Sequence, residues 1–361
     1  GHIDFEHIRG FISQEFYEEC CKKYIPQIND IYMIKSGATT GKVAKVETQK
    51  LFTIWSPLAV FRVEPQRCYY EYLYYFIQSD AYQKQIENKW TYGTQQNIGM
   101  RTLEKLMICF PSITQQKLIA DYLDSKCSKI DEIIEKQQAI IEKLKEYKIS
   151  IITEVVTKGL DYEVDYKESG TEWLGKIPSH WQYLSFKNVL KERNEKNFPV
   201  KTAERLSLSI DKGVTLYSEK TTNLDRFKDD VSQYKLAHEG DFVLNSMNMI
   251  VGAVGISHYF GCVSPAYYTY YDNEEDHITA KYCDYLFHSK TVKKVLHSLG
   301  KGIMSIDRGD DRINTCRLKV SRTDLRALKI PVPPICEQRE IVKYLQSKEN
   351  LIDKTIADRN K

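Results

Sequence analysis

The chain repeats itself at long range, and this repeat constrains the fold more than any other feature of the sequence. Residues 110–126 recur, degenerate but aligned, as residues 332–348, so that Pro111 pairs with Pro333 and Gln116 with Gln338 at a constant offset of 222 positions. Segments upstream of each copy match more loosely. Repeats of about 20–50 residues are typical of solenoids, so a repeat of this length indicates duplicated domains. We expect a globular module followed by a long helix, present twice.

Length and composition agree with two ordinary globular domains. The chain has 361 residues, of which 42% are hydrophobic and 28% charged. No apolar run approaches the roughly 18 residues of a membrane span, and no signal peptide opens the chain, so we expect a cytoplasmic protein with no membrane partner. The nine cysteines are scattered without a C-x-x-C pair, which favours reduced thiols and predicts no metal site.

The net charge of +3 is small, but basic residues cluster in one region. Between Gly300 and Ile330 there are eight basic and four acidic residues, and about twelve residues of this region are extra relative to the first copy. Lys301, Arg308 and Arg312 are therefore candidates for contacts with DNA, either with phosphates or with guanine bases. The alternative is a solvated loop in which the arginines pair with neighbouring aspartates.

A heptad pattern predicts one long helix from Ser112 to Lys158. Apolar residues recur every seven positions in two rows offset by four, and neither Pro nor Gly interrupts them before Gly159. At about 1.5 Å per residue the helix is roughly 65–70 Å long, so its seam needs a long partner, which the second copy supplies. The predicted seam consists of Leu123, Ile130, Ile134, Ile141, Leu144 and Ile151 with Leu345 and Ile352.

The chain path predicts that the two helices are antiparallel. The second helix begins at the second module and packs along the first helix, so it runs back toward the first module. Two homologous modules on a rigid spacer, related by a pseudo-two-fold axis, are typical of a protein that recognises two separated sites. A coiled coil that only spaces two domains is the alternative.

Each module is predicted to mix strands and helices. Residues 30–35 and 42–46 read as strands in the first module, and residues 241–245 and 252–256 as their counterparts. Tyrosine-rich residues 71–87 predict a helix, matched by residues 281–299. We expect an α+β fold with a mixed, twisted and partly closed sheet.

The turn between the first two strands is a candidate DNA contact. Its sequence, Gly37-Ala-Thr-Thr-Gly41-Lys42, resembles a P-loop, but it has three residues between the glycines rather than four, and Val43 where magnesium needs Ser or Thr. A tight polar turn that approaches a phosphate is the better interpretation. The candidates are Ser36, Thr39, Thr40 and Lys42, with Asn245 and Asn248 in the second module.

A second polar segment of the first module is a candidate for base contacts. Gln95, Gln96 and Asn97 follow one another, and Gln and Asn form paired hydrogen bonds with adenine. The alternative is an ordinary polar loop. The chain has no methyltransferase tetrapeptide, glycine-rich cofactor loop, His-Glu-x-x-His or Gly-x-Ser-x-Gly, so we expect no catalysis by the chain alone.

These features together resemble the specificity subunits of type I restriction-modification systems. The resemblance lies in Tyr166–Trp181, which is similar to the family's start of a target recognition domain, in residues 36–43 with Ser56-Pro57, and in residues 93–98 leading to residues 111–116 and the helix. It covers essentially the whole chain. It implies two target recognition domains that each read one half of a bipartite double-stranded DNA sequence, on a helical spacer.

The resemblance also implies partners and cofactors. Methyltransferase (M) subunits that dock on the helices would supply S-adenosylmethionine, and restriction or translocase (R) subunits would supply ATP hydrolysis with magnesium. The complex would be an adenine methyltransferase and ATP-dependent endonuclease, while this chain would hold no cofactor and be a non-catalytic prokaryotic cytoplasmic subunit.

The expected domains are a first target recognition domain (1–111), a spacer helix (112–160), a second target recognition domain (161–333) and a second spacer helix (334–361). Compared with its repeat, the first domain lacks about fifty N-terminal residues, and the second helix stops about twenty residues short of the first.

Overall fold

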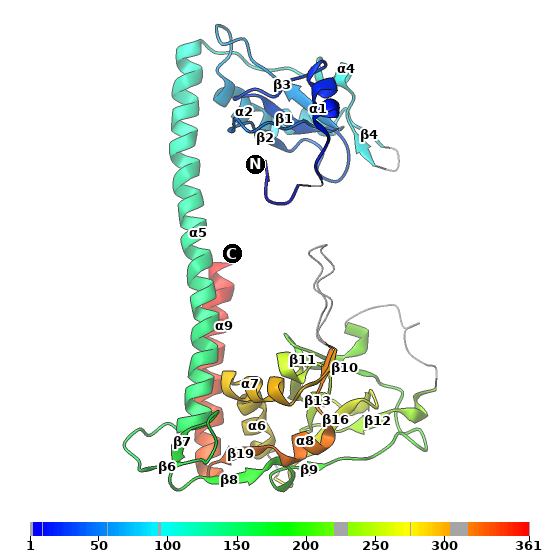
Figure 1. Cartoon of the computed structure of the whole chain (residues 1–361), viewed down its shortest axis with the longest axis vertical. Helices are drawn as coiled ribbons and strands as arrows, with labels where there is room; N and C mark the ends of the chain where they lie inside the picture. Colours follow the sequence, from blue (N-terminus) through cyan, green and yellow to red (C-terminus); the bar gives the residue numbers. More distant parts are fainter. Residues whose placement is uncertain are drawn as a thin grey trace. The chain divides into compact units, whose positions relative to one another are not determined.

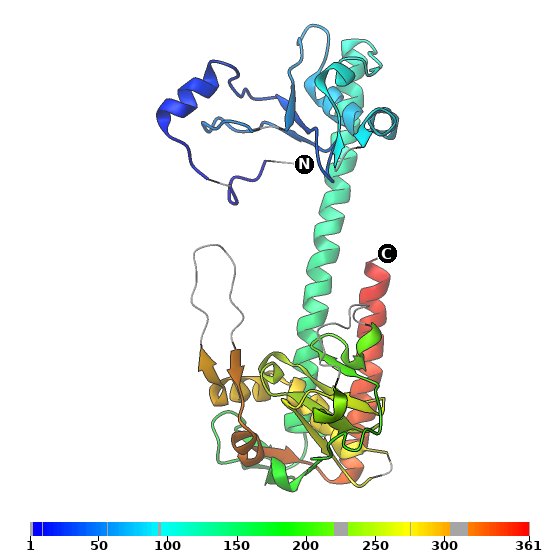
Figure 2. The same ribbon diagram turned by 90° about the vertical axis from the view of Figure 1, so that its right-hand side faces the viewer.

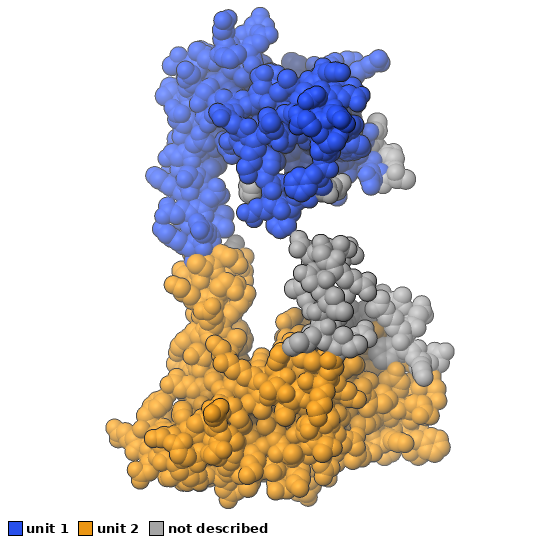
Figure 3. All heavy atoms as spheres, viewed as in Figure 1, with its two compact units in different colours: residues 1–136 blue, residues 137–361 orange. Residues whose placement is uncertain are grey.

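The computed structural model describes residues 3–8, 10–55, 57–92, 95–219, 230–274, 276–303 and 317–360. Its contacts divide the chain into two compact units, residues 1–136 and residues 137–361 (Figure 3). We call these unit 1 and unit 2. The predicted Ser56, Arg308 and Arg312 lie outside the described residues.

Unit 1 is built around a small antiparallel sheet covered by helices. The sheet has the order β2-β1-β3, and its core contains Ile31, Met33, Ile77 and Tyr82. The elements of unit 1 are α1 (Gln14–Cys21), β1 (Ile31–Ile34), β2 (Val43–Lys45), β3 (Leu58–Phe61), α2 (Tyr70–Gln78), α3 (Asp80–Glu87), β4 (Thr91–Tyr92), β5 (Gln96–Asn97), α4 (Met100–Leu103) and the first half of α5 (Ile113–Lys158).

Unit 2 has the same α+β plan with more strands. Its central sheet has the order β14-β13-β16-β9. The elements are β6 (Tyr166–Glu168), β7 (Lys176–Pro178), β8 (Gln182–Ser185), η1 (Phe186–Asn188), β9 (Lys191–Glu192), β10 (Leu206–Ser209), β11 (Gly213–Leu216), η2 (Tyr217–Glu219), η3 (Val231–Gln233), β12 (Lys235–Ala237), β13 (Phe242–Asn245), η4 (Met249–Val251), β14 (Val254–Ile256), β15 (Gly261–Val263), β16 (Tyr267–Tyr271), α6 (Ile278–His288), α7 (Lys290–Leu299), β17 (Lys301–Ile303), β18 (Arg317–Lys319), α8 (Arg322–Ala327), β19 (Lys329–Val332) and α9 (Ile335–Arg359).

The two units repeat individual hydrogen bonds as well as elements. The buried Gln116 donates to the Pro111 carbonyl at 2.9 Å, and the buried Gln338 donates to the Pro333 carbonyl at 2.9 Å. Each glutamine stands near the start of a long helix and ties it to the segment that leads in. The duplication seen in the sequence is therefore present in the hydrogen bonds of both units.

Within unit 2, α9 packs antiparallel on the C-terminal half of α5 (Figures 1 and 2). Lys148 of α5 pairs with Asp353 at 2.9 Å and with Glu349 at 3.3 Å, whereas Gln137, eleven residues earlier, accepts from Arg359. Contacts that move forward along one helix as they move backward along the other define an antiparallel pair. The predicted direction is confirmed.

The seam between these helices is buried over only part of its predicted length. Ile141, Ile151, Leu345 and Ile352 are buried, and Leu123 and Leu144 are half-buried. Ile130 and Ile134 are 54% and 59% exposed. The last α9 pair with α5 that we describe joins Arg359 to Gln137, so the seam role of these two residues stays a prediction.

The predicted helices 71–87 and 281–299 are each broken once, which the sequence analysis missed. Ser79 and Ser289 are extended, and each hydroxyl donates to a carbonyl of the preceding helix and caps the next helix by accepting an N–H three residues ahead. A serine that satisfies both helix ends makes a corner without Pro or Gly.

A buried ion pair fixes the start of the sheet in unit 1. Asp30 is 1% exposed, and Arg62 donates to both of its oxygens at 2.7 Å. Burial by itself raises the pKa of this carboxyl, but hydrogen bonds from Arg62, Tyr24 and Gln27 outweigh it and hold the pKa below its ordinary value of 3.8. In unit 2, Arg193 likewise donates to both oxygens of the buried Asp241, at 2.7 and 3.0 Å.

Replacing Asp30 by Asn should lower the free energy of unfolding of unit 1 by about 1.5–3 kcal/mol at pH 7, because charged hydrogen bonds are lost. A depressed carboxyl pKa stabilises the folded state above pH 3.8, and this stabilisation disappears as pH falls through the folded-state pKa. The difference between wild type and variant in denaturant unfolding should therefore shrink below about pH 4. Asp80→Asn, which removes an exposed pair with Lys84, is the control and should unfold close to wild type, because water and salt screen exposed pairs. An equal loss in both variants would contradict this account.

In the part of the chain that the structure describes, no helix is both long enough and apolar enough to cross a membrane.

Candidate nucleic-acid interface

In unit 1, the turn from Ser36 to Lys42 joins β1 to β2 and is held by its own hydrogen bonds. Gly37 and Gly41 have φ of +100° and +91°, which L side chains rarely adopt. The Thr40 hydroxyl donates to the Gly37 carbonyl at 2.8 Å, and Thr40 is buried. Thr40 thus stabilises the turn, while Thr39 and Lys42 are exposed on it and Ser36 is half-buried.

The β4–β5 hairpin pairs with this turn and brings the two candidate segments of unit 1 together. Gly37 N–H donates to the Gln96 carbonyl at 2.9 Å, Ile98 N–H donates to the Lys35 carbonyl at 2.9 Å, and Ser36 forms a β-bridge with Asn97. Gln95 and Asn97 are exposed and Gln96 is half-buried. Polar groups from residues 36–42 and 95–97, about sixty positions apart, therefore share one surface.

Unit 2 builds the same arrangement from different residues. Asn245 is buried, and its side-chain oxygen accepts from Met247 N–H at 3.1 Å, so it shapes the turn rather than facing solvent. Asn248 is exposed at the start of η4. Val320 N–H donates to the Ser246 carbonyl at 3.0 Å, which is the counterpart of the bond between Ile98 and Lys35.

The β17–β18 hairpin thus occupies in unit 2 the place of β4–β5 in unit 1. The glutamine segment and the basic region are therefore equivalent in backbone pairing, although their sequences differ. Lys301 pairs with Lys319 across β17–β18, and Thr91 with Asn97 across β4–β5. The segment between the two paired residues is therefore twelve residues longer in unit 2 than in unit 1. The two hairpins therefore differ in length.

Several described residues of the basic cluster are neutralised by ion pairs. Lys301 pairs with Asp324 at 3.2 Å, and Arg322 and Arg326 pair with Glu192 at 3.0 and 3.3 Å. The alternative in which Arg308 and Arg312 pair with neighbouring aspartates concerns residues outside the described ranges and stays open. Lys319 is exposed.

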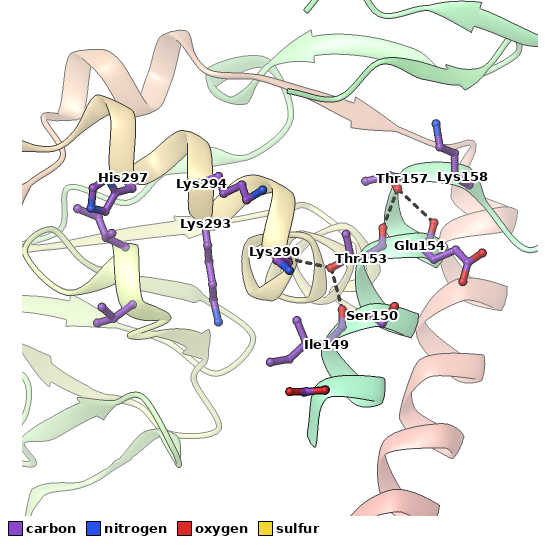
Figure 4. Close-up of a pocket in the computed structure, with 13 residues that line it drawn as sticks. Ile149, Ser150, Thr153, Glu154, Thr157, Lys158, Lys290, Lys293, Lys294 and His297 are labelled. Carbon is purple, nitrogen blue, oxygen red and sulfur yellow. Dashed lines mark hydrogen bonds between the residues drawn. The ribbon is translucent and has the colours of Figure 1, made fainter. Parts of the chain in front are cut away.

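A row of basic residues on α7 was missed by the sequence analysis. Lys290, Lys293, Lys294 and His297 line one wall of a pocket of about 1270 Å³, and Thr153, Thr157 and Lys158 of α5 lie on another wall (Figure 4). The spacing of three and four residues was visible in the sequence, but the basic cluster was counted only from Gly300 onward.

The described residues include no group of three or more His, Cys, Asp or Glu side chains arranged to hold a metal ion.

Comparison with known proteins decides the family. The model of the type I restriction modification DNA specificity domain matches residues 4–146 and 178–360. The chain belongs to this family. The earlier resemblance to type I specificity subunits is thereby confirmed, and the two matched segments correspond to the two copies of the repeat.

Individual relatives agree with the family assignment. A protein of Methanocaldococcus jannaschii assigned as the type I restriction enzyme MjaX specificity subunit is 27% identical, over 95% of this chain and 77% of the relative. The MjaVIII specificity subunit of the same organism is 22% identical, over 98% of this chain and 80% of the relative. The HsdS subunit from Thermoanaerobacter tengcongensis has a similar fold, with a TM-score of 0.52 at 15% identity, over 93% of this chain and 76% of that one.

Proposed function

We propose that each unit of this specificity subunit reads one half of a bipartite duplex DNA sequence. The observation that supports this most is the repeated surface in which a β-hairpin pairs with the turn after a central strand. Such a surface offers exposed side chains to a groove while its backbone stays fixed. Because the hairpins differ in length by twelve residues, we propose that the two half-sites differ in sequence.

Exposure ranks the candidate contacts. In unit 1 we propose that Thr39, Lys42, Gln95 and Asn97 face DNA, with Gln96 and Ser36 supporting them. In unit 2 we propose that Asn248 and Lys319 face DNA, and that Lys301 does so when its ion pair with Asp324 is broken. Thr40 and Asn245 keep a structural role because both are buried. Arg308 and Arg312 remain sequence-based candidates.

We propose that α5 acts as the ruler between the two half-sites and that the helices dock methyltransferase subunits. The support for the ruler is that α5 is one uninterrupted helix of 46 residues, which begins in unit 1 and ends in unit 2. Exposed Ile130, Ile133 and Ile134 offer apolar surface for such a partner. Restriction subunits would join the same complex.

This proposal predicts that the chain alone binds duplex DNA but does not modify it. Binding should weaken linearly in log–log plots as salt rises, since phosphate contacts release counterions. Methyl transfer from S-adenosylmethionine should appear only when methyltransferase subunits are added, and can be measured with a radioactive methyl group. Salt-independent association or methyl transfer by the isolated chain would contradict the proposal.

A further inference from the structure

Helix α7 has one apolar face and one cationic face. Val292 and Leu296 are fully buried in the core of unit 2. On the other side Lys290, Lys294 and His297 are exposed and follow one another at spacings of four and three residues. The helix contains no acidic residue, so nothing along its own length balances this charge.

Among the residues that the structure describes, the lysines of this face have no ion pair of the kind that Lys301 forms. No described residue forms a salt bridge with Lys290, Lys293 or Lys294, whereas Lys301, just beyond the helix, pairs with Asp324. Unpaired exposed lysines next to one another repel, and this repulsion favours binding of an anion.

The cationic face adjoins the turn that we propose reads DNA. Lys293 is half-buried, burial lowers its pKa, and its ammonium lies 3.0 Å from where a Cβ on Gly252 would stand. Gly252 closes the turn that contains Asn248. The β17–β18 hairpin follows α7 directly. The unpaired lysines therefore flank both parts of the candidate reading surface of unit 2.

We propose that Lys290 and Lys294 bind backbone phosphates of the duplex beside the half-site read by unit 2. This inference rests on the proposed function. The two residues are about 6 Å apart along the helix axis, so they can bind separate phosphates of one strand, which recur every ~3.4 Å along the duplex axis. The opposite wall of the pocket holds Glu146 and Glu154. These carboxylates disfavour an acidic protein segment inside the groove, and a duplex that lies along the outer rim of α7 avoids them.

Unit 1 lacks this cationic face at the equivalent helix. In α3, Asp80 and Glu87 stand where α7 has Lys290 and His297, and Lys84 stands where α7 has Lys294. Lys84 pairs with Asp80 at 2.6 Å. Its charge is already compensated, so unit 2 should supply more of the sequence-independent affinity than unit 1.

The test compares the full chain with the double variant Lys290→Gln/Lys294→Gln and with the matched control Lys84→Gln. Affinity is measured by fluorescence anisotropy from about 50 to 200 mM salt, on a duplex with the recognised sequence and on a random duplex. Each lost phosphate contact lowers the slope of log affinity against log salt by about 0.9, so the double variant should lose about 1.8. Its slope should fall equally on both duplexes, and its preference between them should stay unchanged. Lys84→Gln should keep the wild-type slope.

If the double variant keeps the salt slope and the affinity of the wild-type chain, this inference is overturned. The proposed function stands in that case, because the wild-type chain still binds DNA. Wild-type DNA affinity combined with lost association of methyltransferase subunits would also overturn it, and would assign the groove to a protein. A wild-type chain that binds no DNA would remove the proposed function itself. Because the replaced side chains are exposed, circular dichroism should show unchanged melting of both variants.

Discussion

Replacing Trp181 by alanine is expected to lower the free energy of unfolding of unit 2 by about 3–5 kcal/mol. Trp181 is fully buried in the main core of unit 2, between the end of α5 and the start of α9. Its indole N–H donates to Glu337 of α9 at 2.9 Å. A Cβ on Gly159, the residue that ends α5 with a φ of +81°, would lie 3.3 Å from the indole ring. One side chain thus packs against both helix ends, and its removal leaves a cavity there.

Thermal melting of the full chain by circular dichroism measures this effect. For a unit of this size the loss corresponds to a decrease in Tm of roughly 6–20 °C. Trp181→Phe should lie between wild type and alanine, because it keeps most of the packing and loses the hydrogen bond. Trp55→Ala is the control, since Trp55 is 77% exposed and should cost less than about 0.5 kcal/mol. A Trp181→Ala variant that melts with wild type would show that this residue does not join the helices to the core.

Deleting the heptad 130–136 from α5 is expected to shorten the preferred gap between the half-sites by about three base pairs. Seven residues contribute about 10.5 Å of helix, and the duplex rises ~3.4 Å per base pair. The deletion turns one end of the helix by only about 20° relative to the other. The described pairs of Gln137 with Arg359 and of Lys148 with Asp353 lie after the deleted residues, so they should keep their register.

The half-site bases should stay the same in this variant, because neither hairpin is altered. Three base pairs rotate one half-site by roughly 100° about the duplex, so affinity can fall even on the best new gap. Selection from duplexes with randomised gaps measures the change. Replacing the same seven residues with another helical heptad is the matched control and should retain the original gap. Recovery of different half-site bases, or of the original gap at full affinity in the deletion variant, would show that α5 is not the ruler.

The long-range organisation was predictable from the sequence because it depends on periodicity. The uninterrupted heptads predicted both ends of α5 to within one residue. The second copy of the repeat predicted α9, and the chain path predicted its antiparallel direction. The strands β1, β2, β13 and β14 were predicted because they alternate or end at glycines. The spacing of apolar residues in these elements follows from the geometry of a helix or a strand, so a short stretch of sequence is enough to predict them.

Side-chain roles were less predictable, because they depend on partners distant in sequence. Thr40 and Asn245 look like polar contacts in the sequence, but their hydrogen bonds stabilise their own turns. The corners at Ser79 and Ser289 lack Pro and Gly, so no breaker marked them. The equivalence of the two hairpins depends on backbone bonds to Lys35 and Ser246, which no residue type reveals.

The central claim is that one chain recognises two separated, different half-sites, and selection of the wild-type chain on fully randomised duplexes tests it most directly. Bound duplexes would be recovered at physiological salt and sequenced over several rounds. We expect two short, unlike blocks of conserved bases separated by a gap of fixed length with no preferred sequence. A single continuous block, two identical blocks, or no enrichment of any sequence would contradict the account.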